Sequence, residues 1–265
     1  MKKRIYTAIL AALMVLALCG CYTFAVTNEA NTASTVPTFT RDTSPVAETL
    51  VAMNTEPADF PILNKEPILE KWEPGFHVID GVLFYADENW DLLCDGQLGT
   101  LTFDEKGRYT SGNAELDAIV TELLAGFYEE NPSASRYDIL YEAFCYCRDE
   151  FRYVGRGILD FGATGWEVEW ALEALQTKAT NCYGFNAAFC QLARGLGYDA
   201  YCVSGKVLEL AMPHGWCECE IDGELFIFDP QLAYRALTGE RTNWGEDMFQ
   251  VPMWEAWSWR YIWPD

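Results

Sequence analysis

The sequence has few histidines and few basic residues, and both shortages narrow the possible functions. Only two histidines occur among 265 residues, and the Cys-x-Cys pairs lack the spacing of zinc ligands, so no metal site and no cofactor are predicted. Eighteen basic residues stand against 40 acidic ones, which gives a net charge of −22. So acidic a surface repels phosphates and argues against nucleic acid as a partner. It favours basic partners such as cationic peptides, although such charge usually only keeps a protein soluble.

The sequence also lacks a hydrophobic run that would span a bilayer comfortably. The apolar run from Ile5 to Leu18 follows three basic residues, is short, and is typical of an export signal. It leads into the letters LCGC, ending at Cys21, which resemble the lipobox of bacterial lipoproteins. That resemblance implies that residues 1–20 are a signal peptide and that Cys21 is lipidated. The protein is then expected to be exported and anchored to the cell membrane, facing the outside; a plain secretory signal is the alternative.

The composition of the remaining chain predicts three parts. Residues 21–71 are rich in Thr, Asn, Ser, Pro and acidic residues and have no sustained period, which predicts a disordered tether. Residues 72–112 carry hairpin signals, the stronger being Asp80-Gly81 between two apolar segments. The hairpins resemble degenerate units of bacterial cell-wall-binding repeats, but two imperfect copies favour a small structural β region. Residues 113–265 are predicted to form the main domain.

The number of cysteines argues against complete disulfide pairing. Ten cysteines in an exported chain suggest disulfides. With Cys19 and Cys21 set aside, eight remain, and one free nucleophile among them would leave an odd number. We interpret most of the others as small apolar residues, and the redox compartment stays open.

Apolar residues at helical spacing predict four helices in the main domain, over residues 113–130, 137–153, 167–177 and 182–196. Asn181 and Gly197 are suitable capping residues for the fourth helix. Its inward stripe is predicted to comprise Phe185, Ala188, Phe189, Leu192 and Leu196.

Cys182 falls at the start of the fourth helix, outside that inward stripe. The unsatisfied backbone N–H groups of a helix start favour negative charge, and a thiolate is the nucleophilic form of cysteine. The position therefore indicates a nucleophile. A structural cysteine is the alternative, as Cys190 in the middle of the same helix illustrates.

A predicted hairpin supplies a base for this nucleophile. An Asp-Gly turn at 222–223 joins two strands and sets a register in which Asp229 faces Trp216. His214 lies two residues from Trp216 on the same face, so His214 and Asp229 become diagonal neighbours within reach of each other. The other histidine, His77, has no comparable carboxylate partner. We therefore predict that His214 is the base and that Asp229 orients its ring.

Three motifs together resemble the transglutaminase-like superfamily, within the papain-like cysteine enzymes. They are Cys182 at the start of a helix of small residues, the His214-Gly215-Trp216 stretch and the Asp229-Pro230 stretch. The likeness covers roughly residues 137–235. It implies an α+β fold in which helices pack on a small antiparallel sheet, preceded here by the β-hairpin region. It also implies a catalytic triad of Cys182, His214 and Asp229.

The sequence departs from the family pattern at two positions next to the triad. Asn181 stands where Gly or Val is usual, and Gly215 stands where Ala is commoner. Neither departure removes a catalytic group. The backbone N–H of Cys182 is one expected oxyanion donor. Gln176, Trp166 and Trp170 are candidates for a second, although each is better interpreted as a packing or surface residue.

The resemblance implies a cell-surface thiol enzyme that acts on peptide or protein amide bonds through a thioester intermediate. Water as the acceptor gives a protease or amidase, and an amine gives a transglutaminase; the residues do not decide between them. Wall peptides, surface proteins and nutrient peptides are the expected candidates for the substrate. The alternative is a non-catalytic surface module that binds protein or glycan. Its support is the tryptophan content, with Trp254, Trp257, Trp259 and Trp263 close together.

Overall fold

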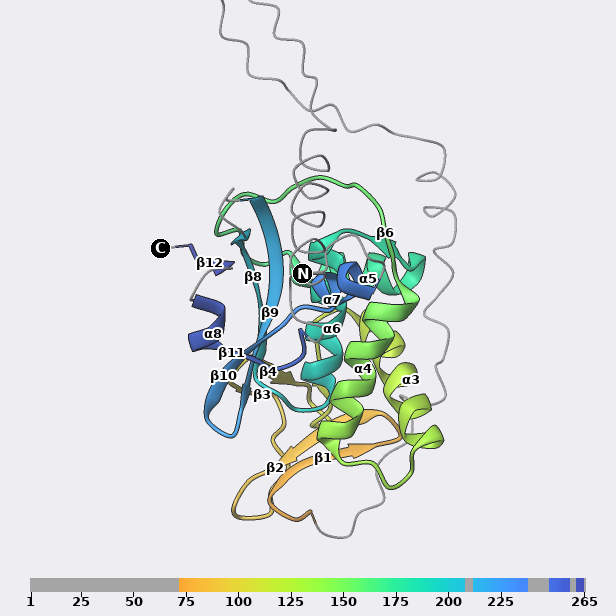
Figure 1. Ribbon diagram of the computed structural model, residues 1–265. Coiled ribbons are helices and arrows are strands. Elements are labelled where there is room, and N and C mark those ends of the chain that lie inside the picture. Colours follow the sequence, from red (N-terminus) through yellow and green to blue (C-terminus); the bar gives the residue numbers. More distant parts are fainter. Residues whose placement is uncertain (1–71, 208–211, 238–247, 258–260, 265) are drawn as a thin grey trace, which may run out of the picture. The chain divides into compact units, whose positions relative to one another are not determined.

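The computed structural model describes residues 72–207, 212–237, 248–257 and 261–264 (Figure 1). The predicted signal peptide (1–20), the lipidated Cys21 and the tether (21–71) lie outside the described residues. Within the described part of the chain, no helix combines the length and the apolar character needed to cross a membrane.

Helices α3 and α4 begin at capped residues, as their sequences predict. Helix α3 spans Ala114–Glu130, and the Asn113 side chain accepts hydrogen bonds from the first free backbone amides of the helix. Helix α4 spans Arg136–Glu150 and starts with a capping box, in which Ser135 and Asp138 each accept a bond from the other's backbone. The predicted end of α4 at residue 153 is wrong, because Phe151 is extended and the chain continues as a strand.

A short parallel strand pair connects α4 to the later helices. Strand β6 (Arg152–Tyr153) pairs with β7 (Ala179–Thr180), which directly precedes α6. Helix α5, over Glu167–Thr177, ends at Lys178 in a left-handed conformation with φ of 53°. A pairing between residues far apart in the sequence produces no local sequence pattern. The helical spacing of apolar residues therefore predicts an α4 that extends too far.

Five antiparallel strands form the main sheet in the order β11-β10-β9-β8-β12 (Figure 1). The predicted Asp-Gly hairpin is confirmed: Phe228 faces Cys217, which is the register that places Asp229 opposite Trp216. Sequence reasoning did not anticipate the two outer strands or helices α7 and α8. The elements are β8 (Ala200–Val207), β9 (Met212–Ile221), β10 (Glu224–Phe228), α7 (Pro230–Leu237), β11 (Val251–Pro252), α8 (Met253–Trp257) and β12 (Tyr261–Ile262).

Helix α6, over Cys182–Gly195, packs against the sheet and against α3, α4 and α5 (Figure 1). Each of its residues is buried, and the five residues of the predicted inward stripe are fully buried. Leu196 is the C-cap of the helix, and Gly197 adopts the positive φ of 84° expected of a glycine after a helix. The α+β prediction, with helices packed on a small antiparallel sheet, is therefore confirmed.

The N-terminal hairpins pair as their turns predict, and they contact the start of strand β8 in the main sheet. Thr100 connects them to that strand: its backbone amide donates to Asp199, and its hydroxyl accepts from the backbone amide of Ala200. Leu83, Leu101 and Phe103 form a small separate hydrophobic cluster. The hairpin strands are β1 (Gly75–Ile79), β2 (Val82–Ala86), β3 (Gly96–Leu98), β4 (Leu101–Phe103) and β5 (Tyr109–Thr110).

Gly205 in β8 permits close contact between the sheet and an aromatic side chain. A Cβ atom at this position would lie 2.2 Å from the Trp216 ring and 2.6 Å from the Ile262 carbonyl oxygen. We expect Gly205→Ala to lower the free energy of unfolding by about 1–3 kcal/mol through overpacking, measured by urea denaturation. The matched control is Gly126→Ala in α3, where a Cβ meets nothing within 4 Å. It should raise stability by about 0.5–1 kcal/mol. Equal effects of the two variants would contradict this account.

Candidate active site

Cys182 is held at the start of α6 by the residue before it. The Asn181 side chain accepts from the amide of Tyr183 at 3.1 Å and donates to the carbonyl of Gly157 at 3.1 Å. Asn181 therefore caps the helix and also ties down the loop that follows β6. This double role accounts for asparagine where the family favours Gly or Val. Cys182 itself is 6% exposed.

His214 and Asp229 meet as the hairpin register predicts. His214 lies on β9, and Asp229 follows β10 directly. His214 Nε2 and Asp229 Oδ2 are 2.6 Å apart, and both residues are buried. Since Nε2 is engaged by the carboxylate, Nδ1 is the ring nitrogen left for Cys182, whose side chain is near enough to His214 to raise the pKa of its imidazole. The structure thus brings the three predicted residues together.

The surroundings of His214 favour its charged form. Burial by itself lowers the pKa of the imidazole. The charges of Asp229 and Cys182, together with their hydrogen bonds, outweigh burial and raise the pKa to about 10. An imidazolium next to a cysteine stabilises the thiolate, which is the nucleophilic form.

Asp229 accepts three further hydrogen bonds from other elements. The Tyr261 hydroxyl donates to Oδ2 at 3.0 Å, the Leu232 amide donates to Oδ1 at 3.0 Å, and Asn186 Nδ2 lies 3.3 Å from Oδ1. These donors come from β12, α7 and α6. Because a buried carboxyl group is costly without such partners, this set of donors holds the Asp229 side chain in place.

Asn186 connects the three parts of the site, and sequence reasoning missed it. Its amide nitrogen lies 2.8 Å from the carbonyl oxygens of both Cys182 and Gly215, in addition to Asp229. All three partners are acceptors, which fixes the orientation of the amide. The sequence feature that could have identified Asn186 is its position one helical turn after Cys182, where the residue is buried. Tyr261 gave no signal, because its pairing partner lies far away in the sequence.

Gly215 makes room for the residue after the nucleophile. A Cβ at position 215 would lie 2.5 Å from the Tyr183 ring. The ring is also contacted edge-on by Trp166 and Trp170. The glycine that departs from the family pattern is therefore matched to the tyrosine at position 183.

Trp216 covers His214 and is fixed by a buried carboxylate. The two rings are nearly parallel with centroids 6.5 Å apart, and Tyr261 lies 4.9 Å from the Trp216 ring. Glu218, only 2% exposed, accepts from Trp216 Nε1 at 2.8 Å and also from the Trp263 indole. These aromatic side chains shield the His–Asp pair from water on this face of the sheet.

Two of the candidate oxyanion donors are engaged elsewhere. Gln176 is exposed and donates to Glu115 on α3 at 2.6 Å. The Trp166 indole donates to the carbonyl of Ala163 at 2.9 Å. Trp170 is half-buried and packs on Tyr183. These positions agree with packing or surface roles. The backbone N–H of Cys182, at the helix start, remains the expected donor.

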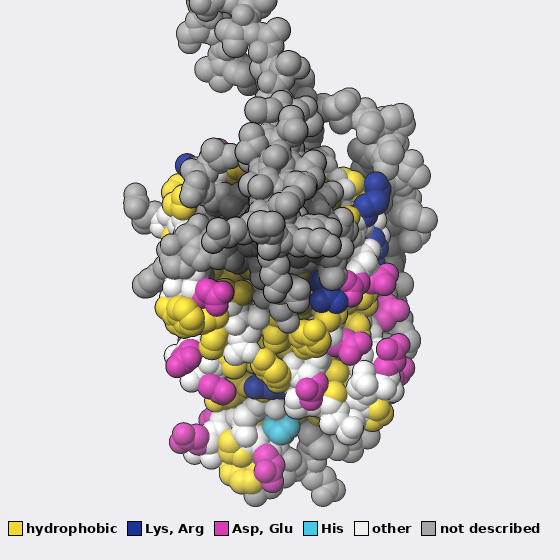
Figure 2. Space-filling view, in the orientation of Figure 1, with side chains coloured by type: hydrophobic (Ala, Val, Ile, Leu, Met, Phe, Trp, Pro, Cys, Tyr) yellow, Lys and Arg dark blue, Asp and Glu magenta, His cyan; other side chains and the backbone are white. Residues whose placement is uncertain are grey.

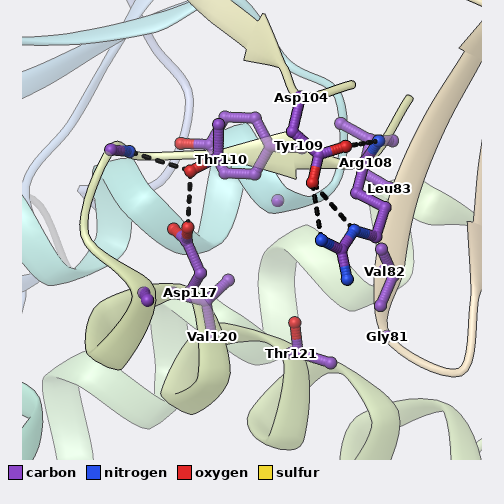
Figure 3. Close-up of a pocket in the computed structure, with 13 residues that line it drawn as sticks. Gly81, Val82, Leu83, Asp104, Arg108, Tyr109, Thr110, Asp117, Val120 and Thr121 are labelled. Atoms are coloured by element: carbon purple, nitrogen blue, oxygen red, sulfur yellow. Dashed lines mark hydrogen bonds and ion pairs between the residues drawn. The ribbon is translucent and has the colours of Figure 1, made fainter. Parts of the chain in front are cut away.

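A cavity of about 310 Å³ between the hairpins and α3 is separate from this site (Figure 3). Its polar lining groups point toward one another. Arg108 pairs with Asp104 at 2.7 Å, and Thr110 donates to Asp117 at 2.6 Å. With these groups satisfied internally, the cavity presents little unpaired polarity to a ligand. The other histidine is bonded to the backbone: His77 Nε2 lies 2.6 Å from the main-chain oxygen of Glu73.

The raised pKa of His214 has a consequence for stability. Because the pKa of about 10 in the folded protein exceeds the ordinary histidine value of 6.5, the stabilisation is full below pH 6.5 and is lost as pH rises through 10. We expect the difference in unfolding free energy between the protein and His214→Gln to shrink across this range, measured by urea denaturation. His77→Gln is the matched control and should show no such trend. A difference that stays constant with pH would refute the ion pair.

Comparisons with known proteins found one matching family and a distant structural neighbour. The model of the transglutaminase-like superfamily matches residues 128–230. No curated protein matched the chain. A crystal structure at 1.9 Å of a candidate cysteine protease from Cytophaga hutchinsonii is similar at 18% identity, with a TM-score of 0.32. That match covers 45% of this chain and 43% of the other, so it spans less than half of either protein. Over residues 128–230, the chain is therefore similar to the transglutaminase-like superfamily.

Proposed function

We propose that the protein is a thiol enzyme that acts on amide bonds of peptides or proteins. The observation that carries the proposal is the buried series in which Cys182 neighbours His214 and His214 is hydrogen-bonded to Asp229. A structural cysteine at a helix start would not require a buried imidazole beside it, nor a carboxylate behind that imidazole. The three residue types stand in the order that nucleophilic catalysis requires.

The proposed reaction proceeds through a thioester. The Cys182 thiolate attacks the amide carbon, and the His214 imidazolium gives its proton to the leaving amine as the C–N bond breaks. His214, now neutral, then takes a proton from the incoming acceptor, and the thiolate is released. Water as the acceptor gives a carboxylate product, whereas an amine gives a new amide. Asp229 keeps the ring oriented throughout and stabilises its charged state.

The charge of the molecule bears on the proposed substrates. Acidic side chains are spread over the described surface of the face shown in Figure 2 rather than gathered in one patch. With a net charge of −22, such a surface attracts cationic peptides and amines over a distance. Peptides or proteins of the cell wall and cell surface are the substrates we propose.

The proposal is tested first by the reactivity of Cys182. We expect its alkylation rate, followed by peptide mass spectrometry, to reach a plateau well below about pH 8. His214→Ala should abolish that plateau together with amide turnover on peptides that contain Gln and Lys. His77→Ala is the matched control and should alter neither. Incorporation of an added amine would identify a transferase, and cleavage without incorporation would identify a hydrolase.

The opposite result would favour a binding module. If alkylation rises only above about pH 8 and ignores His214→Ala, Cys182 is an ordinary thiol. Trp254, which is 74% exposed, would then become the first residue to test for glycan or protein binding.

We further propose that Cys21 carries a lipid and that residues 21–71 tether the folded part, residues 72–265, to the outer surface of the membrane. The lipobox-like letters ending at Cys21 support this location. Growth of expressing cells with a labelled fatty acid should label the chain, and Cys21→Ser should remove the label because the acceptor thiol is gone. Cys19→Ser should retain it. Labelling that persists in Cys21→Ser would disprove lipidation at this residue.

A further inference from the structure

Three cysteine thiols that the proposed reaction does not use meet between α6 and the main sheet. Cys190 lies in the middle of α6 and is fully buried. Cys202 on β8 and Cys217 on β9 are direct cross-strand partners. Gly215, two residues before Cys217, directs its Cβ position toward α6. Since side chains alternate along a strand, Cys202 and Cys217 share the sheet face that α6 covers.

The thiol of Cys202 reaches the backbone of the helix at Cys190. Its sulfur lies 3.8 Å from the carbonyl oxygen of Asn186, which is four residues before Cys190. In an α-helix that carbonyl accepts the amide of Cys190, so the Cys202 sulfur lies close to the Cys190 residue. The Cys190 thiol also influences the pKa values of Cys202 and Cys217, both of which are raised, so Cys190 is the electrostatic neighbour that the other two share.

The three thiols differ in burial and in pKa. Cys190 and Cys217 are fully buried, whereas Cys202 is partly buried and is the least buried of the three residues. Burial raises the pKa of the Cys202 thiol well above its ordinary value. Burial by itself raises the pKa of the Cys190 thiol, but hydrogen bonds from the two neighbours and the charge of Arg194 bring it below its ordinary value. Arg194 is held beside the cluster by its bond to the Ala200 carbonyl at 2.7 Å.

Metal binding is a poor explanation for the cluster. Among the residues that the structure describes, no group of three or more potential ligands could hold a metal ion. Adjacent thiols have another chemistry available, namely oxidation to a disulfide.

We propose that Cys190 and Cys202 form a disulfide when the protein meets a low-molecular-weight disulfide. The Cys202 thiolate attacks one sulfur of the reagent, forms a mixed disulfide and releases one thiol. The Cys190 thiolate then attacks the Cys202 sulfur, closes the protein disulfide and releases the second thiol. The reagent gains two electrons and takes up the two protons that the cysteines lose, and Cys217 remains a free thiol.

This disulfide would fix the helix of the nucleophile to the sheet of the proposed base. Cys190 lies on the same helix as Cys182, and β8 is the neighbour of β9, which carries His214. The covalent bond would therefore hold two elements of the candidate site in register. The inference does not depend on the proposed activity, because the bond forms whether or not Cys182 is a catalyst.

The experiment maps the linkage directly. The full chain is incubated with oxidised glutathione, free thiols are trapped by alkylation at low pH, and peptides are analysed by mass spectrometry without reduction. We expect a peptide pair joined through Cys190 and Cys202, and a rise in Tm of roughly 5–10 °C that a reductant reverses. The same linkage should form in Cys182→Ala, which separates this result from the fate of the proposed function.

Two variants serve as controls. Cys202→Ser should remove both the linked peptide and the rise in Tm, while Cys94→Ser, which changes an exposed cysteine in the hairpin region, should retain both. Circular dichroism checks that each variant is folded. The proposal is overturned if a folded protein gives no linked peptide, or if the link joins Cys190 to Cys217 or involves Cys182.

Discussion

The candidate site depends on a carboxylate that has no contact with water. Asp229 is fully buried, and an isolated charge in such a place would cost far more than the stability of a typical domain allows. The protein meets this cost with donors from α6, α7, β9 and β12. Each of these elements must therefore stand in a defined position for the carboxylate to be satisfied. The positions of His214 and, through it, Cys182 follow from that requirement.

Among the helices, α6 is the one that links the parts of the candidate site to one another. The amide of Asn186 links the first turn of the helix to the sheet, through the carbonyl of Gly215, and to Asp229. The departures from the family pattern fit around the same helix. Asn181 caps it and binds the neighbouring loop, and Gly215 leaves space for the Tyr183 ring. These departures are therefore adjustments in packing around an unchanged set of chemical groups.

Local rules predicted much of this arrangement, and non-local contacts account for what they missed. Helical spacing located α6 with Cys182 as its first residue, and the Asp-Gly turn alone set the register that joins His214 to Asp229. The end of α4 was misplaced because Arg152–Tyr153 pairs with residues 179–180. Tyr261 was missed because β12 joins the sheet beside β8, and no local pattern specifies such a pairing.

The complete burial of α6 has a consequence for motion. Most helices keep one face in water, and local opening begins at such faces and at frayed ends. In α6 every residue is covered, so the helix has no surface from which to open by itself. Its backbone can then exchange with solvent only when much of the domain opens with it. Cys182 thus sits in one of the least mobile parts of the fold, and any adaptation to a substrate falls to the loops around it.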